Sequence, residues 1–310
     1  MTRVLRYALL RILGAIPTIL LVIAIAFLMV HAAPGGPFDE ERVLPPEIER
    51  NVERAYHLDE PLPKQFVRYL GGVLRGDLGP SYRYRDYTVS ELIANALPVS
   101  MRLGALAMLL ALALGIAAGV LAALRKNTVL DRLVTGFAMI GISVPVFVVA
   151  PLMVLVFAVL LDWLPASWTG GSGGGRLIMP VIALALPQIA YIARLTRASM
   201  INVMTSDYVR TARAQGLGTV AIVRYHVLKP AVLPLMSYIG PAIAGVLTGS
   251  VVVEQVFGIP GVGQFFIQGA LNRDYTLVLG ITIFYAVIVI ALNLAVDLAY
   301  GFLDPRIRAQ

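Results

Sequence analysis

The chain has 310 residues, of which 58% are hydrophobic and 14% are charged, and it contains no cysteine. Because an ordinary soluble domain carries about a quarter charged residues, this composition indicates long apolar segments that cross a membrane. The lack of cysteine excludes disulfides, thiolate metal sites and cysteine nucleophiles. The net charge of +7 is concentrated in short segments between apolar runs, which is typical of membrane topology rather than of nucleic-acid binding.

Six apolar segments of membrane-spanning length follow one another along the chain. They are predicted over residues 12–31, 99–124, 133–161, 177–193, 231–253 and 277–302. Each is near the roughly 20 residues that a helix needs to cross the hydrocarbon core. Pro145 and Pro151 predict a tilt or a break in the third span, and the fourth is short and contains Pro180 and Pro187. The first is longer than the apolar region of a signal peptide, so we expect it to be retained.

Charge asymmetry between the connecting segments predicts the orientation. Arginine and lysine residues gather at the N-terminus, in the turn at 124–132, in the loop at 194–230 and at the C-terminus. The segment 32–98 on the other side carries more acidic than basic residues. The positive-inside rule therefore predicts that both termini and the 194–230 loop are cytoplasmic.

The long segment after the first span predicts a second feature of the architecture. Ile48, Val52, Ala55 and Tyr56 recur near helical spacing, which predicts a small helical lobe on the outer surface. We therefore expect two parts, a first transmembrane helix with an extracytoplasmic lobe (1–98) and a five-helix core with its cytoplasmic loop (99–310). The expected fold class is an all-α integral membrane protein with six transmembrane helices.

A short helix is predicted in the basic loop, where residues 206–230 read SDYVRTARAQGLGTVAIVRYHVLKP. Ser206 is a suitable N-cap, Asp207 suits the positive end of the helix dipole, and Gly216 is a natural stop. A helix of this length, about 13 Å, is too short to cross a membrane.

Residue spacing also predicts how that short helix is used. Tyr208, Thr211, Ala212 and Gln215 would share one face, and its small residues would let another backbone approach closely. An amphipathic helix in a basic cytoplasmic loop suits docking to another protein. A helix that lies against lipid headgroups through its arginines is the alternative.

The same segment resembles the conserved cytoplasmic loop of ABC-importer permeases, whose short coupling helix docks on an ATPase subunit. The matching residues are Asp207, Tyr208, Val209, Arg210, Thr211, Ala212, Arg213, Ala214, Gln215 and Gly216. The general family form has Glu-Ala-Ala where this chain has Thr211-Ala212-Arg213, so the acid is missing. This departure makes the chain similar to the peptide and nickel branch of the family. Residues 3–37, 56–59, 76–79, 254–263, 272–275 and 304–306 also resemble that branch, and the oligopeptide permeases are the most similar within it.

The resemblance implies a type I importer permease that is not itself an enzyme. It implies a second, homologous permease subunit, two ATPase subunits that handle ATP and Mg²⁺, and an external binding protein that delivers peptide. Dipeptides, glutathione and nickel chelates are alternative substrates. No lysine stands in a Walker A arrangement, and His31, His57 and His226 are scattered, so neither a nucleotide site nor a metal site is expected. Two alternative functions from other classes are a membrane-embedded lipid-modifying enzyme and a secondary transporter.

Two further sites are predicted in or beside the spans. The loop after the fifth span is apolar and rich in glycine, which is consistent with an outer gate that dips back toward the pathway. Its candidate residues are Glu254, Phe257, Pro260, Gly261 and Gly263. Asp297 is an ionisable residue within the sixth span, for which we favour a structural role near the cytoplasmic end over a functional one.

Overall fold

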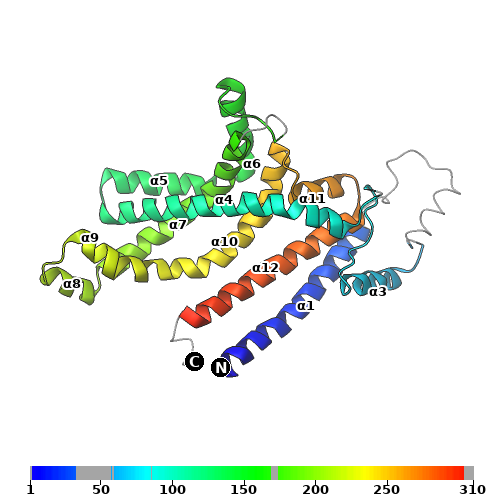
Figure 1. The fold of residues 1–310 in the computed structure, drawn as a ribbon, viewed down its shortest axis with the longest axis horizontal. Coiled ribbons are helices and arrows are strands. Elements are labelled where there is room, and N and C mark those ends of the chain that lie inside the picture. Colours follow the sequence, from blue (N-terminus) through cyan, green and yellow to red (C-terminus); the bar gives the residue numbers. More distant parts are fainter. Residues whose placement is uncertain (1, 33–56, 58, 85, 169–173, 304–310) are drawn as a thin grey trace.

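The computed structural model describes residues 2–32, 57, 59–84, 86–168 and 174–303, with side chains from residue 12 to residue 296. The described chain is built from helices (Figure 1). The α-helices are α1 (Thr2–Ala32), α3 (Leu62–Val73), α4 (Val89–Leu124), α5 (Val129–Ser143), α6 (Val146–Met153), α7 (Ile178–Met204), α8 (Asp207–Ala214), α9 (Thr219–Ile222), α10 (Leu228–Phe257), α11 (Val262–Leu271) and α12 (Tyr275–Leu303). Two π-helical segments, η1 (Val154–Leu160) and η3 (Val223–Val227), and one 3₁₀ turn, η2 (Gly174–Leu177), join them.

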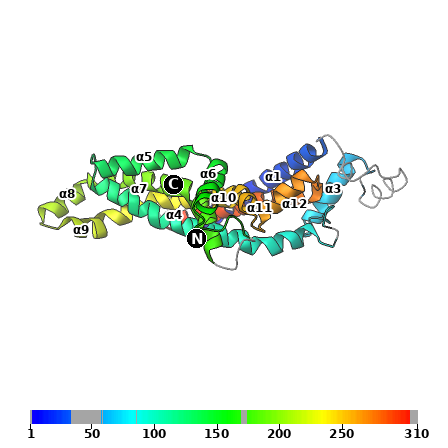
Figure 2. The ribbon, with the colours of Figure 1, turned by 90° about the horizontal axis from the view of Figure 1, so that it is seen from above.

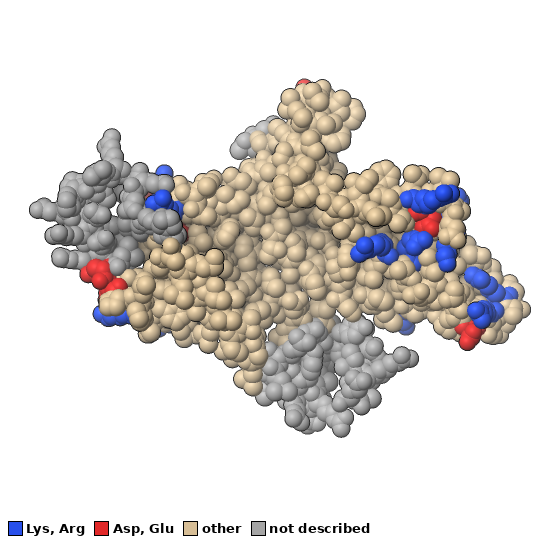
Figure 3. Space-filling view, turned by 180° about the vertical axis from the view of Figure 1, so that it is seen from behind, with Lys and Arg blue, Asp and Glu red and all other residues tan. Residues whose placement is uncertain are grey.

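The expected membrane spans are confirmed in number. Within the described residues, five helices are long and apolar enough to cross a membrane, and a bent pair brings the number to six if it counts as one span. In the space-filling view, charged side chains lie near the two ends of the long axis, and the broad middle of the visible face carries almost none (Figure 3). This band is the part of the surface that suits contact with hydrocarbon.

The bent pair is the third span, and its break lies at Pro145. The helices before and after it, 129–143 and 146–160, differ in direction by 103°. Val144 is extended, with φ −86° and ψ 117°, as expected for a residue that precedes proline. Pro151 lies inside α6 and does not end it. Of the two prolines, only Pro145 therefore breaks the span, and α6 with η1 projects from the side of the helix bundle (Figure 1).

Two of the expected boundaries are wrong. Helix α4 begins at Val89 rather than at residue 99, because Thr88 and Glu91 form a capping box that starts a regular helix before the apolar run. Helix α7 is not short, since it continues past residue 193 to Met204. The first part of the expected 194–230 loop is therefore helix. Apolar character marks the part of a helix that faces lipid, whereas backbone hydrogen bonds decide where the helix ends.

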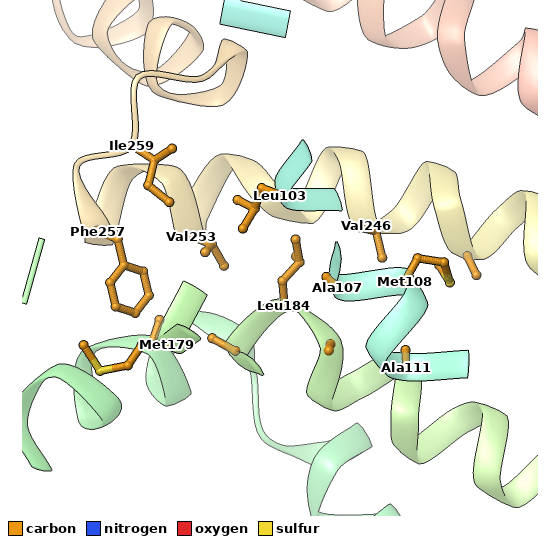
Figure 4. Close-up of a cluster of buried hydrophobic side chains, with 14 of the residues drawn as sticks. Leu103, Ala107, Met108, Ala111, Met179, Leu184, Val246, Val253, Phe257 and Ile259 are labelled. Atoms are coloured by element: carbon orange, nitrogen blue, oxygen red, sulfur yellow. The ribbon is translucent and has the colours of Figure 1, made fainter. Parts of the chain in front are cut away.

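Among the described helices, α4 and α7 share the most extensive contact. Gly115 and Gly119 lie on the side of α4 that meets α7, where a Cβ atom on Gly119 would come within 2.6 Å of the Ala193 carbonyl oxygen. Small residues four apart let two helix backbones approach closely, which is a common basis of helix association in membranes. The main core packs around this crossing and includes Leu103, Ala107, Leu184, Val246 and Phe257 (Figure 4).

Helices α1 and α12 pack along each other on the other side of the molecule (Figure 1). Most of residues 12–32 of α1 are exposed in the isolated chain, with Leu21 at 60% and Met29 at 69%. Seen from above, the bundle is elongated, with α8 and α9 at one end and α3 near the other (Figure 2). The helical pattern expected at Ile48–Tyr56 lies outside the described residues, and the division into residues 1–98 and 99–310 stays a prediction.

Candidate functional site

Helix α8 forms where a short helix was predicted, in the connection between α7 and α10. It ends in a Schellman motif, because the amide of Gly216 donates to the Arg213 carbonyl (2.9 Å) and that of Leu217 to the Ala212 carbonyl (3.2 Å). Gly216 has φ +83°, a conformation that costs glycine little. Ser206 precedes the helix, but its hydroxyl donates to the Val203 carbonyl at 2.6 Å instead of capping α8.

The inward face of α8 anchors it to the rest of the chain. Val209 is fully buried and Ala212 is 4% exposed. Both belong to a cluster with Ala123 of α4, Met200 of α7 and Ile222 of α9. Ala212 therefore does not share an accessible face with Tyr208 and Thr211, as was expected, since it packs inside this chain. The docking role of α8 stays a prediction. Because the helix is fixed to α4 and α7 through this cluster, a displacement of α8 would be transmitted to these helices.

The outward face of α8 is polar and accessible. Tyr208 is 48% exposed, and Arg210, Thr211, Arg213, Ala214, Gln215 and Gly216 are exposed as well. Asp207 and Arg210 form an exposed ion pair at 3.4 Å. An exposed pair of this kind contributes little to stability. Because both side chains are exposed, another molecule can reach both charges.

The turn between α10 and α11 packs inside the chain and is held by polar contacts. Glu254 has no exposed surface, and its Oε2 atom accepts the amide of Gly263 at 2.7 Å. The Ser100 hydroxyl oxygen of α4 accepts the amide of Val262 at 3.0 Å. Two side chains from other helices thus satisfy amides of the first turn of α11, whose own N-cap, Gly261, has no side chain to do so.

The candidate gate residues lie together in this turn. Phe257 is 1% exposed, and Ile259 between it and Pro260 is fully buried. Gly258 takes the left-handed conformation (φ +62°) that ends α10. The apolar residues of the loop are therefore accounted for by packing within this chain, and a gating role of the turn stays a prediction.

One ion pair near α8 was not anticipated from the sequence. Asp131 of α5, 3% exposed, accepts two hydrogen bonds from the Arg197 guanidinium of α7, at 2.5 and 2.8 Å. The amide of Asn127 also donates to Asp131 at 2.9 Å. The pair brings the turn after α4 and the last turns of α7 to the same end of the molecule. The available signal was that Asp131 is the one acid in the turn at 124–132, which also holds Arg125, Lys126 and Arg132.

The last two predictions concern Asp297 and metal binding. Asp297 lies in α12, and its side chain is outside the part of the structure that is described. Among the described residues, no group of three or more His, Cys, Asp or Glu side chains could hold a metal ion.

Comparison with known proteins identifies the family. Residues 115–309 match the family described as the inner membrane component of binding-protein-dependent transport systems. The chain belongs to this family. Residues 4–104 match the N-terminal part described for membrane components of the same systems. The chain is thus a permease subunit of an ABC importer in the inner membrane, and its relatives are transport subunits rather than enzymes.

Individual relatives agree with this assignment. The chain is 52% identical over 307 residues to the oligopeptide transport system permease protein OppB of Salmonella typhimurium, covering 98% of this chain and 99% of that protein. It is 41% identical over 304 residues to the dipeptide transport system permease protein DppB of Bacillus subtilis, covering 98% of both.

A solved structure supports the fold. The permease resembles a chain in a crystal structure of an amino acid ABC transporter with histidines, with a TM-score of 0.51 and 20% identity, over 68% of this chain and 94% of that one. At that identity the likeness shows the fold alone.

Proposed function

We propose that this permease forms half of the translocation pathway of an oligopeptide importer. The observation that carries the substrate class is the 52% identity to an oligopeptide permease across nearly the whole chain, against 41% to a dipeptide permease. A second, homologous permease subunit forms the other half of the pathway. An external binding protein delivers the peptide, and two ATPase subunits bind ATP and Mg²⁺.

Helix α8 is the proposed contact with an ATPase subunit. Its support is the division of the helix into a buried face, with Val209 and Ala212, and an accessible polar face, with Tyr208 and Thr211. The ATPase subunit contacts the polar face. The buried face passes the resulting movement to α4 and α7. This places α8, and with it both chain termini, on the cytoplasmic side, in agreement with the clustering of arginine there.

The turn that Glu254 and Ser100 hold is the proposed outer gate, with Phe257, Pro260, Gly261 and Gly263 as its other residues. Its support is that this turn, together with α11, connects two long helices, α10 and α12. A movement of either helix would therefore move the turn. Asp297 is proposed to act as a structural carboxylate near the cytoplasmic end of α12.

The experiment is to express the chain with its genomic neighbours, reconstitute the purified complex in liposomes, and measure ATP hydrolysis stimulated by peptide and its binding protein. Oligopeptides should stimulate hydrolysis more than dipeptides, glutathione or nickel chelates do. Transport by this chain without an ATPase subunit would contradict the proposal.

A matched pair of variants tests the docking of α8. Tyr208→Ala should reduce the amount of ATPase subunit that copurifies with the permease. Tyr87→Ala is the control, because Tyr87 is 49% exposed, close to the 48% of Tyr208, and immediately precedes Thr88, the N-cap of α4. The first turn of α4 lies at the end of the molecule away from α8 (Figure 1). Equal copurification in the two variants would remove α8 from the interface.

A further inference from the structure

A cavity of about 530 Å³ opens between α5 and α7, beside the ion pair that joins them. Its lining residues are Asn127, Asp131, Arg132, Thr135, Gly136, Met139 and Arg197. None of them belongs to the coupling helix or to the turn at Glu254.

The charge at the mouth of the cavity is positive. Asp131 is the one acid in the lining, and the bidentate hydrogen bonds from Arg197 neutralise it. Arg132 is exposed and has no ion-pair partner among the described residues. Basic side chains gather around this end of the molecule (Figure 3). A single anionic group such as a phosphate would complement this mouth, because arginine binds phosphate oxygens in a bidentate geometry.

The cavity continues from this mouth along α5 as a largely apolar trough. Gly136 and Met139 line it about one helical turn apart, and Thr135 lies beside Gly136. A Cβ atom at Gly136 would have no atom within 4 Å, so the trough is open at that point. Next to it, Phe137 is 71% exposed and Ile140 60% exposed, on a helix of the membrane-spanning set.

We propose that this cavity binds one anionic phospholipid, with its headgroup phosphate at Arg132, beside the ion pair of Asp131 and Arg197, and an acyl chain along Gly136 and Met139. A cationic mouth that leads into an apolar trough matches the chemistry of a lipid. A soluble anion or an acidic protein segment would use the mouth but would gain nothing from the trough. The bound lipid fills the gap between α5 and α7 beside their ion pair.

The experiment is native mass spectrometry of the purified complex in detergent, with phosphatidylglycerol or phosphatidylcholine added. Phosphatidylglycerol should remain bound at one molecule per permease chain, and phosphatidylcholine should not. Gly136→Leu, which fills the trough and changes no charge, should abolish this binding. Gly14→Leu is its control, because Gly14 is equally open but lies on α1.

A charge variant tests the mouth of the cavity independently. Arg132→Gln should weaken phosphatidylglycerol binding about tenfold, as expected for the loss of one charged hydrogen bond. Arg75→Gln, at an exposed arginine just after α3, removes the same charge and should leave binding unchanged.

Three results would overturn the proposal. Undiminished binding in Gly136→Leu would show that no acyl chain lies in the trough. Displacement of the lipid by inorganic phosphate at equal concentration would identify a site for a free anion. Loss of a copurifying subunit in Arg132→Gln would show that the cavity receives a protein.

Discussion

The carboxylate of Glu254 near the end of α10 accepts the amide of Gly263 in the first turn of α11, at 2.7 Å. The two residues belong to different helices, and the hydrogen bond fixes the angle at which the chain turns between them. Glu254 is fully buried, and its Oε2 atom satisfies an amide that the first turn of α11 would otherwise leave without a partner. This contact therefore compensates part of the cost of burying a carboxylate.

Glu254→Ala should destabilise the permease by about 1–3 kcal/mol, because it leaves the buried Gly263 amide without its acceptor. Glu254→Gln keeps an acceptor oxygen of similar size and should be milder. The measurement is the melting temperature of the detergent-solubilised protein. If both variants have the melting temperature of the wild type, the contact contributes nothing to stability.

Gly263→Ala should also be destabilising, by about 1–3 kcal/mol, because a core this tight does not accept an added methyl group. Its Cβ atom would lie 2.9 Å from Glu254 Oε2 and closer still to the backbone of Val251. Gly71→Ala in α3 is the control, since no atom lies within 4 Å of a Cβ there. That substitution should be neutral or stabilise α3 by up to about 1 kcal/mol. Equal melting temperatures for the two variants would contradict the geometry.

Asp131→Ala should cost about 3–5 kcal/mol, because it leaves the Arg197 guanidinium without its partner in a partly buried site. Asp131→Ala combined with Arg197→Met should be less damaging than the sum of the two single variants. Asp207→Ala is the matched control, since the pair of Asp207 with Arg210 is exposed and should contribute less than about 1 kcal/mol. Additive effects of Asp131 and Arg197 would argue against direct coupling.

Ala212→Phe should prevent folding of the α8 region rather than only uncouple the ATPase. Ala212 is 4% exposed and packs among residues of α4, α7 and α9, so a large side chain has no space. The expected result is faster proteolysis of the α7–α10 connection, together with loss of ATPase stimulation. Thr211→Phe, at an exposed position of the same helix, should affect stimulation alone. The assignment of the two faces is wrong if the proteolysis rates are the same.

Acidification should loosen α3. Hydrogen bonding from Lys64, aided by the charge of Arg68, holds the pKa of Glu60 below its usual value. A lowered pKa stabilises the fold above the unfolded pKa, about 4.3 for glutamate, and this contribution is lost as the pH falls through the lower folded value. Amide hydrogen exchange in α3, corrected for its intrinsic pH dependence, should therefore rise below about pH 4. Glu60→Gln should abolish this dependence, and an unchanged profile in that variant would exclude Glu60 as its origin.

Much of the fold followed from the sequence. Apolar runs located the spans, and the sequence from Asp207 to Gly216 located α8 because a helix-starting acid and a left-handed glycine bound it locally. The ends of α4 and α7 were missed, since capping and backbone hydrogen bonds continue a helix beyond its apolar part. The sequence predicted a break at Pro145, at Pro151 or at both. The structure shows that the chain is extended before Pro145, whereas α6 continues through Pro151.

The sequence by itself determined the membrane spans and a short helix in a basic loop, because hydropathy, charge asymmetry and helix caps are local properties of the chain. Its resemblance to ABC-importer permeases supplied the transport role. Only the tertiary structure decided which face of α8 is accessible, that Ala212 is buried, and that Asp131 meets Arg197. Those relationships depend on how α4, α5 and α7 pack, and close approach at Gly115 and Gly119 sets that packing. Contacts between residues far apart in the chain leave no period or motif in the sequence from which they could be predicted.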